Sequence, residues 1–322
     1  MNKKLKEIVM VLILGLFLPA VVFSSTQKIW MSDKHVESET KMETSSNDDL
    51  NQRVSVLMND DQILMMDIQD YITAVVLCEM PATFDIEALK AQAVVARTYT
   101  MRRQTGENKH DGAAVCTDSA CCQGYREPDD YIASGGNMEL LDKVRQAVAQ
   151  TENQVLLYNG KLIDATYFSC SGGMTENAVA VWGADIPYLQ ATESPGEEHA
   201  AHYVDTVKFS TADFINKLKL SGVKNNNVDI TDITYTEGGG VDRITICGES
   251  FKGTEIRRLL SLRSTAFSVT ALGDSVTITT KGFGHRVGMS QYGAEAMAVN
   301  GSTYDQILFH YYKGTELSSY ED

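Results

Sequence analysis

The sequence predicts an α+β protein, in which mixed helices and antiparallel strands form one globular catalytic unit with a small inserted α/β lobe, after an N-terminal membrane anchor. Helix-like and strand-like segments are mixed without the regular alternation that predicts a parallel α/β sheet. An Asn-Gly pair between two apolar runs marks an antiparallel hairpin. The 322 residues suffice for one large domain or for two lobes sharing a core.

The N-terminus carries a compartment signal. Three lysines within the first six residues precede an uncharged apolar run from Ile8 to Phe23. This pattern is typical of an export signal or a signal anchor, so residues 1–24 are expected to reach the membrane. The pattern leaves open whether the anchor is retained or cleaved, but either way the remainder works outside the cytoplasm. Residues 25–52 are polar and rich in serine, threonine and acids, which predicts a flexible linker.

The predicted catalytic domain covers residues 53–317 and begins with a strand at 53–58. Two helices are expected over Asp67–Met80 and Asp85–Arg103, because apolar residues recur there at steps of three and four. Pro81 ends the first helix, which places Glu79 at the junction between the two. A third helix is expected over Glu139–Thr151.

The second half is richer in strands. Runs at 154–158 and 162–168 flank the Asn-Gly pair and are expected to form a hairpin. Residues 205–280 combine one helix, Thr211–Lys219, with short strands such as 243–246 and 275–278, and form a possible sub-lobe. A glycine-rich loop and two helices follow, with a capping box of Thr303 and Gln306 at the start of the final helix and Gly314 at its end.

Composition excludes one class of function. The chain has 43 acidic and 28 basic residues, a formal net charge of -15. Nucleic-acid binding needs lysines and arginines that displace phosphate counterions, so the acid excess argues against it and favours solubility.

Glu79 is the first candidate for chemistry. It stands in Cys-Glu-Met-Pro at the end of an apolar helix. Partial desolvation there raises a carboxyl pKa and lets the group act as a general acid. The alternative is a solvated glutamate at a helix end.

Two polar loops could bind a ligand. Residues 167–173 follow the hairpin and turn on two glycines, which could present hydroxyls, although a plain strand exit is the alternative. A serine nucleophile is disfavoured because no strand–elbow–helix context is present. Residues 282–294 lack the Lys-Ser/Thr pair of a phosphate loop, but carry His285, Ser290, Gln291 and Tyr292, which suit sugar hydroxyls. The alternative for His285 is a core histidine bound by the loop backbone.

A histidine and three cysteines lie within thirteen residues, at His110, Cys116, Cys121 and Cys122. Their ligand types suit zinc, although the spacing is not that of a standard finger. Disulfides or free thiols are the alternative for an exported protein.

Together these segments resemble the stage II sporulation protein D family over roughly residues 53–317. The resemblance rests on Glu-Met-Pro at 79–81 with the helix at 89–99, Cys-Gln-x-Tyr at 122–125, Tyr-x-Ser-x-Ser-Gly-Gly-x-Thr at 167–175, Val-Trp-Gly at 181–183, Pro-Tyr-Leu at 187–189, Leu-Arg-Ser at 262–264, the loop at 284–294 and His-Tyr-Tyr-Lys-Gly-Thr at 310–315. Phe283 and Arg286 depart from it, since the family commonly has Trp and Gly there.

The resemblance implies a peptidoglycan lytic transglycosylase of endospore engulfment. Such an enzyme cleaves the MurNAc–GlcNAc bond of denuded glycan strands and leaves 1,6-anhydro-MurNAc ends. It is expected at the cell membrane as a single-pass protein, with its catalytic domain on the mother-cell side of the engulfing septum. The implied partners are the amidase stage II sporulation protein P and the membrane scaffold stage II sporulation protein M.

The resemblance also assigns residues. Glu79 is the expected catalytic acid/base. The expected substrate-binding residues are Arg97, Tyr167, Ser169, Ser171, His285 and Gln291. Zinc is expected on His110, Cys116 and Cys122, but is not required for chemistry, because other members lack these cysteines. Two alternatives stay open: a non-catalytic glycan-binding activator of a cell-wall amidase, a role suggested by the related amidase enhancers, and a zinc hydrolase.

Overall fold

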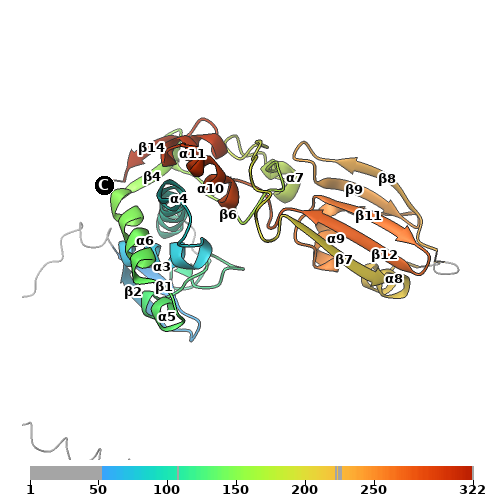
Figure 1. The fold of residues 1–322 in the computed structure, drawn as a ribbon, viewed down its shortest axis with the longest axis horizontal. Helices are drawn as coiled ribbons and strands as arrows, with labels where there is room; N and C mark the ends of the chain where they lie inside the picture. The colour runs from blue at the N-terminus through green and yellow to red at the C-terminus, as the bar shows by residue number, and fades with distance from the viewer. Residues whose placement is uncertain (1–52, 107–108, 222, 224–226, 321–322) are drawn as a thin grey trace, which may run out of the picture. The chain divides into compact units, whose positions relative to one another are not determined.

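The computed structural model describes residues 53–320 except 107–108, 222 and 224–226 (Figure 1). The predicted membrane segment and linker lie outside the described residues. Within these described ranges, no helix combines the length and apolar character needed to cross a membrane. The described chain is α+β, as the sequence predicts, but two of its strand pairings are parallel rather than antiparallel.

The first half builds a small sheet and two helices. Strand β1 (Arg53–Leu57) pairs antiparallel with β2 (Ile63–Asp67) and parallel with β3 (Val115–Cys116). Helix α3 (Ile68–Glu79) follows directly, because the Asp67 side chain caps its first amides. Helix α4 (Ile86–Thr105) is capped in the same way by Asp85. Both helices therefore lie within two residues of their predicted bounds.

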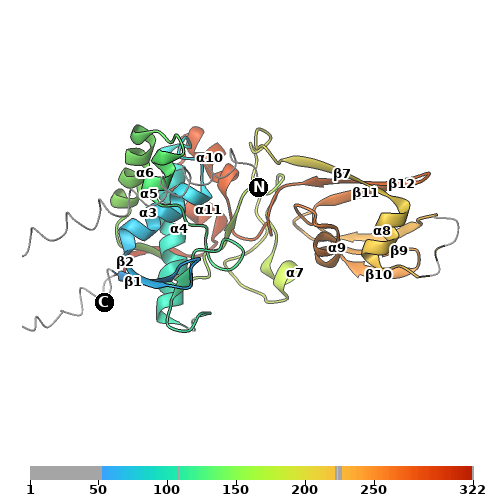
Figure 2. The same ribbon diagram turned by 90° about the horizontal axis from the view of Figure 1, so that it is seen from below.

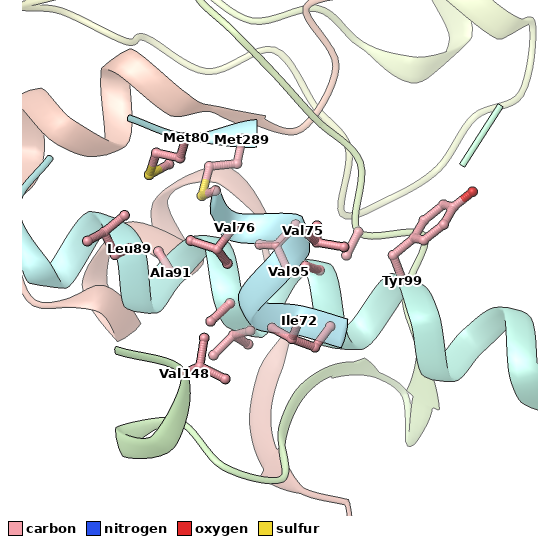
Figure 3. Close-up of a cluster of buried hydrophobic side chains, with 14 of the residues drawn as sticks. Ile72, Val75, Val76, Met80, Leu89, Ala91, Val95, Tyr99, Val148 and Met289 are labelled. Atoms are coloured by element: carbon pink, nitrogen blue, oxygen red, sulfur yellow. The ribbon is translucent and has the colours of Figure 1, made fainter. Parts of the chain in front are cut away.

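Helix α4 runs through the centre of the main core. Thirteen of its twenty residues are buried, so it lacks the polar face of a surface helix. Its alanines allow close approach by α3, α6 (Met138–Gln150), α10 (Gln291–Val299) and α11 (Tyr304–Tyr311). Figure 3 shows Leu89, Ala91 and Val95 of α4 packed beside Val76 of α3, with the Tyr99 hydroxyl pointing away from the cluster.

The hairpin prediction is correct at its turn and wrong in its second strand. Strands β4 (Gln154–Tyr158) and β5 (Lys161–Leu162) are antiparallel, and Asn159 and Gly160 adopt φ values of 51° and 69°, as a two-residue turn between twisted strands requires. Only Lys161 and Leu162 continue the hairpin. The chain then leaves β4, whose other edge is occupied by β14 (Glu316–Ser319).

The remainder of that predicted strand serves a different pairing. Strand β6 (Tyr167–Phe168) lies parallel to β13 (Met289–Ser290), 122 residues further along. This pairing brings the hydroxyl-rich turn at 167–173 beside the glycine-rich loop at 282–294. Two segments that the sequence presents separately therefore form one surface.

Residues 204–281, the small lobe, contain a second hydrophobic core, separate from the main one. One sheet has the order β11-β12-β7 and the other β10-β9-β8, all antiparallel. The strands are β7 (Val204–Ser210), β8 (Ile230–Tyr235), β9 (Val241–Ile246), β10 (Glu249–Lys252), β11 (Phe267–Leu272) and β12 (Ser275–Lys281). Helices α8 (Thr211–Leu218) and α9 (Gly253–Leu260) pack on them (Figure 2).

The predicted capping box of Thr303 and Gln306 is present at the start of α11. The predicted end is wrong, because α11 stops at Tyr311 and Gly314 lies in the turn that follows, with φ 67°. Two short helices, α5 (Pro128–Ala133) and α7 (Ala178–Trp182), complete the fold.

Candidate functional site

A pocket of about 480 Å³ brings together five of the residues that the sequence singled out. These residues are Glu79, Tyr167, Ser169, His285 and Gln291. They come from the end of α3, from β6 and its exit, from the glycine-rich loop and from the first residue of α10. The β6–β13 pairing is therefore the step that assembles this pocket.

Glu79 is the last residue of α3 and is only partly exposed. Burial raises the pKa of its carboxyl, and hydrogen bonds from the Gly124 amide, Tyr167 and Gln291 oppose the rise without cancelling it. The C-terminal end of a helix dipole disfavours a negative charge in the same direction. This environment favours a carboxyl group that holds its proton and can release it to a ligand.

Glycine at position 124 permits this environment. The Gly124 amide donates to Glu79 Oε1. A Cβ atom there would lie 2.8 Å from Cys78 Sγ and 2.9 Å from Glu79 Oε1, closer than side-chain carbons approach such atoms. Any larger residue would therefore force the Cys78 or Glu79 side chain, or the amide itself, to shift.

Tyr167 has one hydroxyl proton and two acceptors for it. Its hydroxyl lies 3.2 Å from Gln123 Oε1 and also hydrogen-bonds Glu79. Gln123 is buried and fixed by a 3.0 Å bond from its Nε2 to Thr100 Oγ1. When Glu79 is ionised, Tyr167 can donate to it; when Glu79 is protonated, Tyr167 can accept from it and donate to Gln123. The hydroxyl thus accommodates both protonation states.

Gln123 was not among the predicted site residues. Its signal in the sequence was its place in the Cys-Gln-x-Tyr segment. Tyr99 was also missed as a pocket residue, because its position matched the buried periodicity of the helix; its ring lines the pocket from α4. Phe168 and Phe283 add aromatic surface to the wall.

His285 lines the pocket and is also bound by its own loop. Its Nδ1 accepts from the Val287 amide at 3.2 Å, and the ring makes a further hydrogen bond to the Tyr167 backbone. Burial, with a smaller effect of the positive charge of Arg257, lowers the pKa of His285 to about 4. The imidazole is therefore neutral at pH 7 and contributes polarity and shape rather than positive charge.

Two predicted substrate-binding residues lie outside the pocket. Arg97 is only 2% exposed, and its guanidinium donates to the carbonyl oxygens of Thr151 and Val148 and to Gln69 Oε1. It therefore ties α4 to the end of α6 and to α3. Ser171 is fully buried and donates to Glu197 Oε2 at 2.9 Å. Both side chains hold the scaffold, so the structure corrects their placement in the glycan groove.

Buried charges fix the loops around the pocket. Glu197 accepts the amides of Ser171 and Gly172 at 2.7 and 3.0 Å. Arg286 has φ 66° and forms a buried ion pair with Glu176 at 3.2 Å. Its guanidinium also donates to the carbonyl oxygens of Ser171, Met174 and Gly238. Arg286 thus anchors the loop that carries His285. The spacing of residues in the sequence identified neither Glu176 nor Glu197.

A His/Cys cluster adjoins the pocket. Ligand atoms of His110, Cys116, Cys121 and Cys122 all lie within 4.8 Å of one another, and Cys122 also lines the pocket. The three predicted ligands are brought together, and the structure adds Cys121 as a fourth. All six cysteines lie in the described part of the chain and none of them forms a disulfide there.

The distances fit a tetrahedral metal ion. His110 Nε2 lies 3.6 Å from Cys121 Sγ and 3.5 Å from Cys122 Sγ, and the two sulfurs are 4.0 Å apart. Zn–S and Zn–N bonds of about 2.3 and 2.05 Å in a tetrahedron give N–S and S–S edges of about 3.6 and 3.8 Å. These three ligands could therefore hold a metal ion with little rearrangement, and Cys116 lies within 4.8 Å of each of them.

Comparison with known proteins identifies the family. A family model described as Stage II sporulation protein matches residues 59–158. The chain is 40% identical over 257 residues to Stage II sporulation protein D of Bacillus subtilis (strain 168), covering 78% of this chain and 74% of that protein. Stage II sporulation protein D of Bacillus amyloliquefaciens is equally similar. The Amidase enhancer of Bacillus subtilis (strain 168) is 32% identical over 75% of this chain and 39% of its own length. The chain belongs to the stage II sporulation protein D family, whose members take part in the cell-wall remodelling of sporulation.

Proposed function

We propose that the protein is a lytic transglycosylase that cuts denuded peptidoglycan strands with Glu79 as its acid/base. The observation that carries the proposal is the pocket's acid content. Of the described residues that line it, Glu79 alone bears a carboxylate. An ordinary glycosidase needs two such groups, whereas a reaction in which the sugar supplies its own nucleophile needs one.

The chemistry proceeds through one proton carrier. Protonated Glu79 donates to the oxygen that joins MurNAc to GlcNAc, and the bond from that oxygen to the MurNAc anomeric carbon breaks. The MurNAc 6-hydroxyl oxygen attacks the oxocarbenium-like centre and closes the 1,6-anhydro ring. Its proton passes to the Glu79 carboxylate, which restores the acid. No water is consumed, so the two products together have the mass of the substrate.

The pocket walls suit this substrate. Tyr167 stabilises either protonation state of Glu79. Ser169 and Gln291 offer polar groups for sugar hydroxyls or the acetamido group. The neutral His285 avoids a buried cation beside the developing positive charge of the sugar.

The cellular setting is part of the proposal. We place the protein at the cell membrane, with its catalytic domain on the mother-cell side of the engulfing septum. There, stage II sporulation protein P would supply strands without stem peptides, and stage II sporulation protein M would act as the scaffold. Support comes from the family membership and from the apolar run in residues 8–23.

We also propose that the His/Cys cluster binds zinc. Three thiolates and one imidazole form a closed set that suits a structural ion, since a catalytic zinc keeps one position open. His110, Cys116, Cys121 and Cys122 would hold it, and the ion would stiffen the segment that leads to Gln123 and Gly124. This donor set argues against the zinc-hydrolase alternative.

The test uses purified denuded strands and mass spectrometry. The wild-type protein should release products lighter by one water than hydrolytic products, and Glu79→Gln should release almost none, because a general acid contributes about 100- to 10,000-fold. Glu295→Gln is the matched control: Glu295 also has a raised pKa and is partly buried, but it binds the Asp85 amide outside the pocket. Hydrolytic products, or cleavage preserved in Glu79→Gln, would contradict the proposal.

The similarity to the Amidase enhancer keeps one other function in view. If the protein is a glycan-binding activator, the wild type and the Glu79→Gln variant should stimulate the amidase equally well, and neither should cut strands. Measuring amidase activity in the same samples separates the two functions.

A further inference from the structure

Trp182 has no role in the site described so far. It ends α7 and is 45% exposed, which makes it one of three exposed tryptophan, tyrosine or phenylalanine side chains in the described part of the chain, with Tyr235 and Phe309. Gly183 follows with φ 77° in the left-handed region and terminates the helix. The sequence marked Val-Trp-Gly only as part of a family resemblance.

The ring of Trp182 is connected to the catalytic pocket. Its centroid lies 5.3 Å from that of His285, and the His285 centroid lies 5.5 Å from that of Phe168. Both His285 and Phe168 line the pocket. Three rings in edge-on and tilted contact therefore lead from the pocket wall to solvent, and none of them carries a charge because His285 is neutral. The indole thus contacts the pocket wall through His285 and keeps 45% of the residue's surface open to solvent.

The backbone under Trp182 is fixed. The amide of Ala178 donates to the Leu189 carbonyl at 3.0 Å, and the Ala191 amide donates to Asn177 Oδ1 at 2.7 Å. The Asn177 side chain also donates to Glu237 at 2.8 Å. A side chain on a held backbone loses less conformational freedom when a ligand covers it than one on a free loop, which favours binding at its exposed surface.

We propose that Trp182 is a stacking platform for a sugar ring of the glycan strand, beyond the bond that Glu79 cuts. A pyranose presents one face of aliphatic C–H groups, which complements the negative face of an indole and displaces water from apolar surface. The occupant is a sugar of the same strand, because the platform continues the wall of the pocket in which the proposed reaction occurs. The inference rests on the proposed function only for the identity of that strand.

The platform explains a preference for polymeric substrate. A sugar on Trp182 adds binding energy far from the reacting bond. Covering roughly 60 Å² of indole surface corresponds to about tenfold in affinity. Loss of the ring should therefore raise KM for long strands about tenfold and leave kcat and the cleavage of short fragments little changed.

The chain offers a direct probe of this contact. It contains two tryptophans, Trp30 and Trp182, so Trp30→Phe in the full-length chain leaves Trp182 as the single indole. With Glu79→Gln added to prevent cleavage, titration with denuded strands should give a saturable change in tryptophan fluorescence. Strand binding observed by calorimetry without any fluorescence change would overturn the proposal.

Substitutions give an independent readout. In the Glu79→Gln background, Trp182→Ala should weaken strand binding about tenfold, while Trp182→Phe should retain most of it and guards against misfolding. Tyr235→Ala is the matched control, because Tyr235 is 60% exposed on β8 of the small lobe. Unchanged strand affinity in Trp182→Ala, or an equal loss in Tyr235→Ala, would refute the platform. Intact strand binding by Trp182→Ala together with loss of amidase stimulation would assign the ring to a protein partner instead.

The two proposals fail separately. If the wild-type protein releases no anhydro products but the fluorescence titration saturates, the platform stands and the lytic reaction does not. If anhydro products form and the fluorescence remains constant during strand binding, the reaction stands and the platform does not.

Discussion

Tyr167→Phe should move the alkaline limb of the pH–rate profile upward. The substitution removes only the hydroxyl, which hydrogen-bonds Glu79 and lies 3.2 Å from Gln123 Oε1. That bond favours the ionised carboxyl and lowers the pKa of Glu79. Without it, the pKa of Glu79 rises further above its usual value, and the acid stays protonated to higher pH.

The magnitude follows from the two roles of the hydroxyl. A hydrogen bond to a charged group contributes about 1.5–3 kcal/mol, and a bond between neutral groups about 0.5–1.5 kcal/mol. Because Tyr167 can bond Glu79 in both protonation states, the net effect on ionisation is the difference, about 1–1.5 kcal/mol, or roughly one pKa unit.

The assay measures kcat/KM for strand cleavage across pH, because this parameter reports ionisations of the free enzyme. The alkaline limb of Tyr167→Phe should lie about one unit above that of wild type. Tyr99→Phe is the matched control, since Tyr99 lines the same pocket but makes no hydrogen bond to Glu79. An unchanged or lowered limb in Tyr167→Phe, or the same rise in Tyr99→Phe, would refute this account of Glu79.

Three further predictions concern stability and metal binding. Burial raises the pKa of Glu79 above 4.5, so protonation of Glu79 stabilises the folded state at low pH, and this stability is lost as pH rises through the folded pKa. Glu79→Gln should therefore raise Tm more at pH 7.5 than at pH 4. Calorimetry showing the reverse would contradict the raised pKa. Arg286→Met should lower the free energy of unfolding by about 3–5 kcal/mol, because it leaves Glu176 charged and buried without its partner. Urea denaturation should show part of this loss recovered when Glu176→Gln is added, and a single substitution with no effect would exclude the ion pair as an anchor. The Cys121→Ser variant should lose zinc to a chelator sooner than the wild type does. The control Cys247→Ser, in the small lobe, should not. If elemental analysis shows that Cys121→Ser retains as much zinc as the wild type, Cys121 is not a ligand.

Local patterns in the sequence were sufficient for much of the fold. The helices over 68–79 and 86–105 were predictable because the apolar spacing, the aspartate caps and Pro81 all act within a few residues. The turn at Asn159 and Gly160 was predictable for the same reason, since it depends on positive φ at two adjacent positions. Glu79 was a candidate because of its local place at a helix end between apolar segments, but that pattern also fits a solvated glutamate, and the catalytic role came from the family resemblance.

Long-range pairing limited the rest. The strand predicted over 162–168 failed because β6 binds a segment 122 residues away instead of continuing the hairpin. Arg97 and Ser171 were expected to bind substrate because the family resemblance assigned them that role. In the fold, their partners are backbone carbonyls and Glu197, and these lie buried in the scaffold.

The sequence by itself predicted helices α3 and α4, the hairpin turn and the capping box, since each depends on residues that are close together in the chain. It pointed to the family through the combination of motifs spread over residues 79–315. Only the tertiary structure decided which side chains surround Glu79 and that burial raises its pKa. It also decided that Cys121 joins the His/Cys cluster and that Trp182 rests on His285. These properties depend on desolvation and on distances between distant segments, which no local pattern encodes.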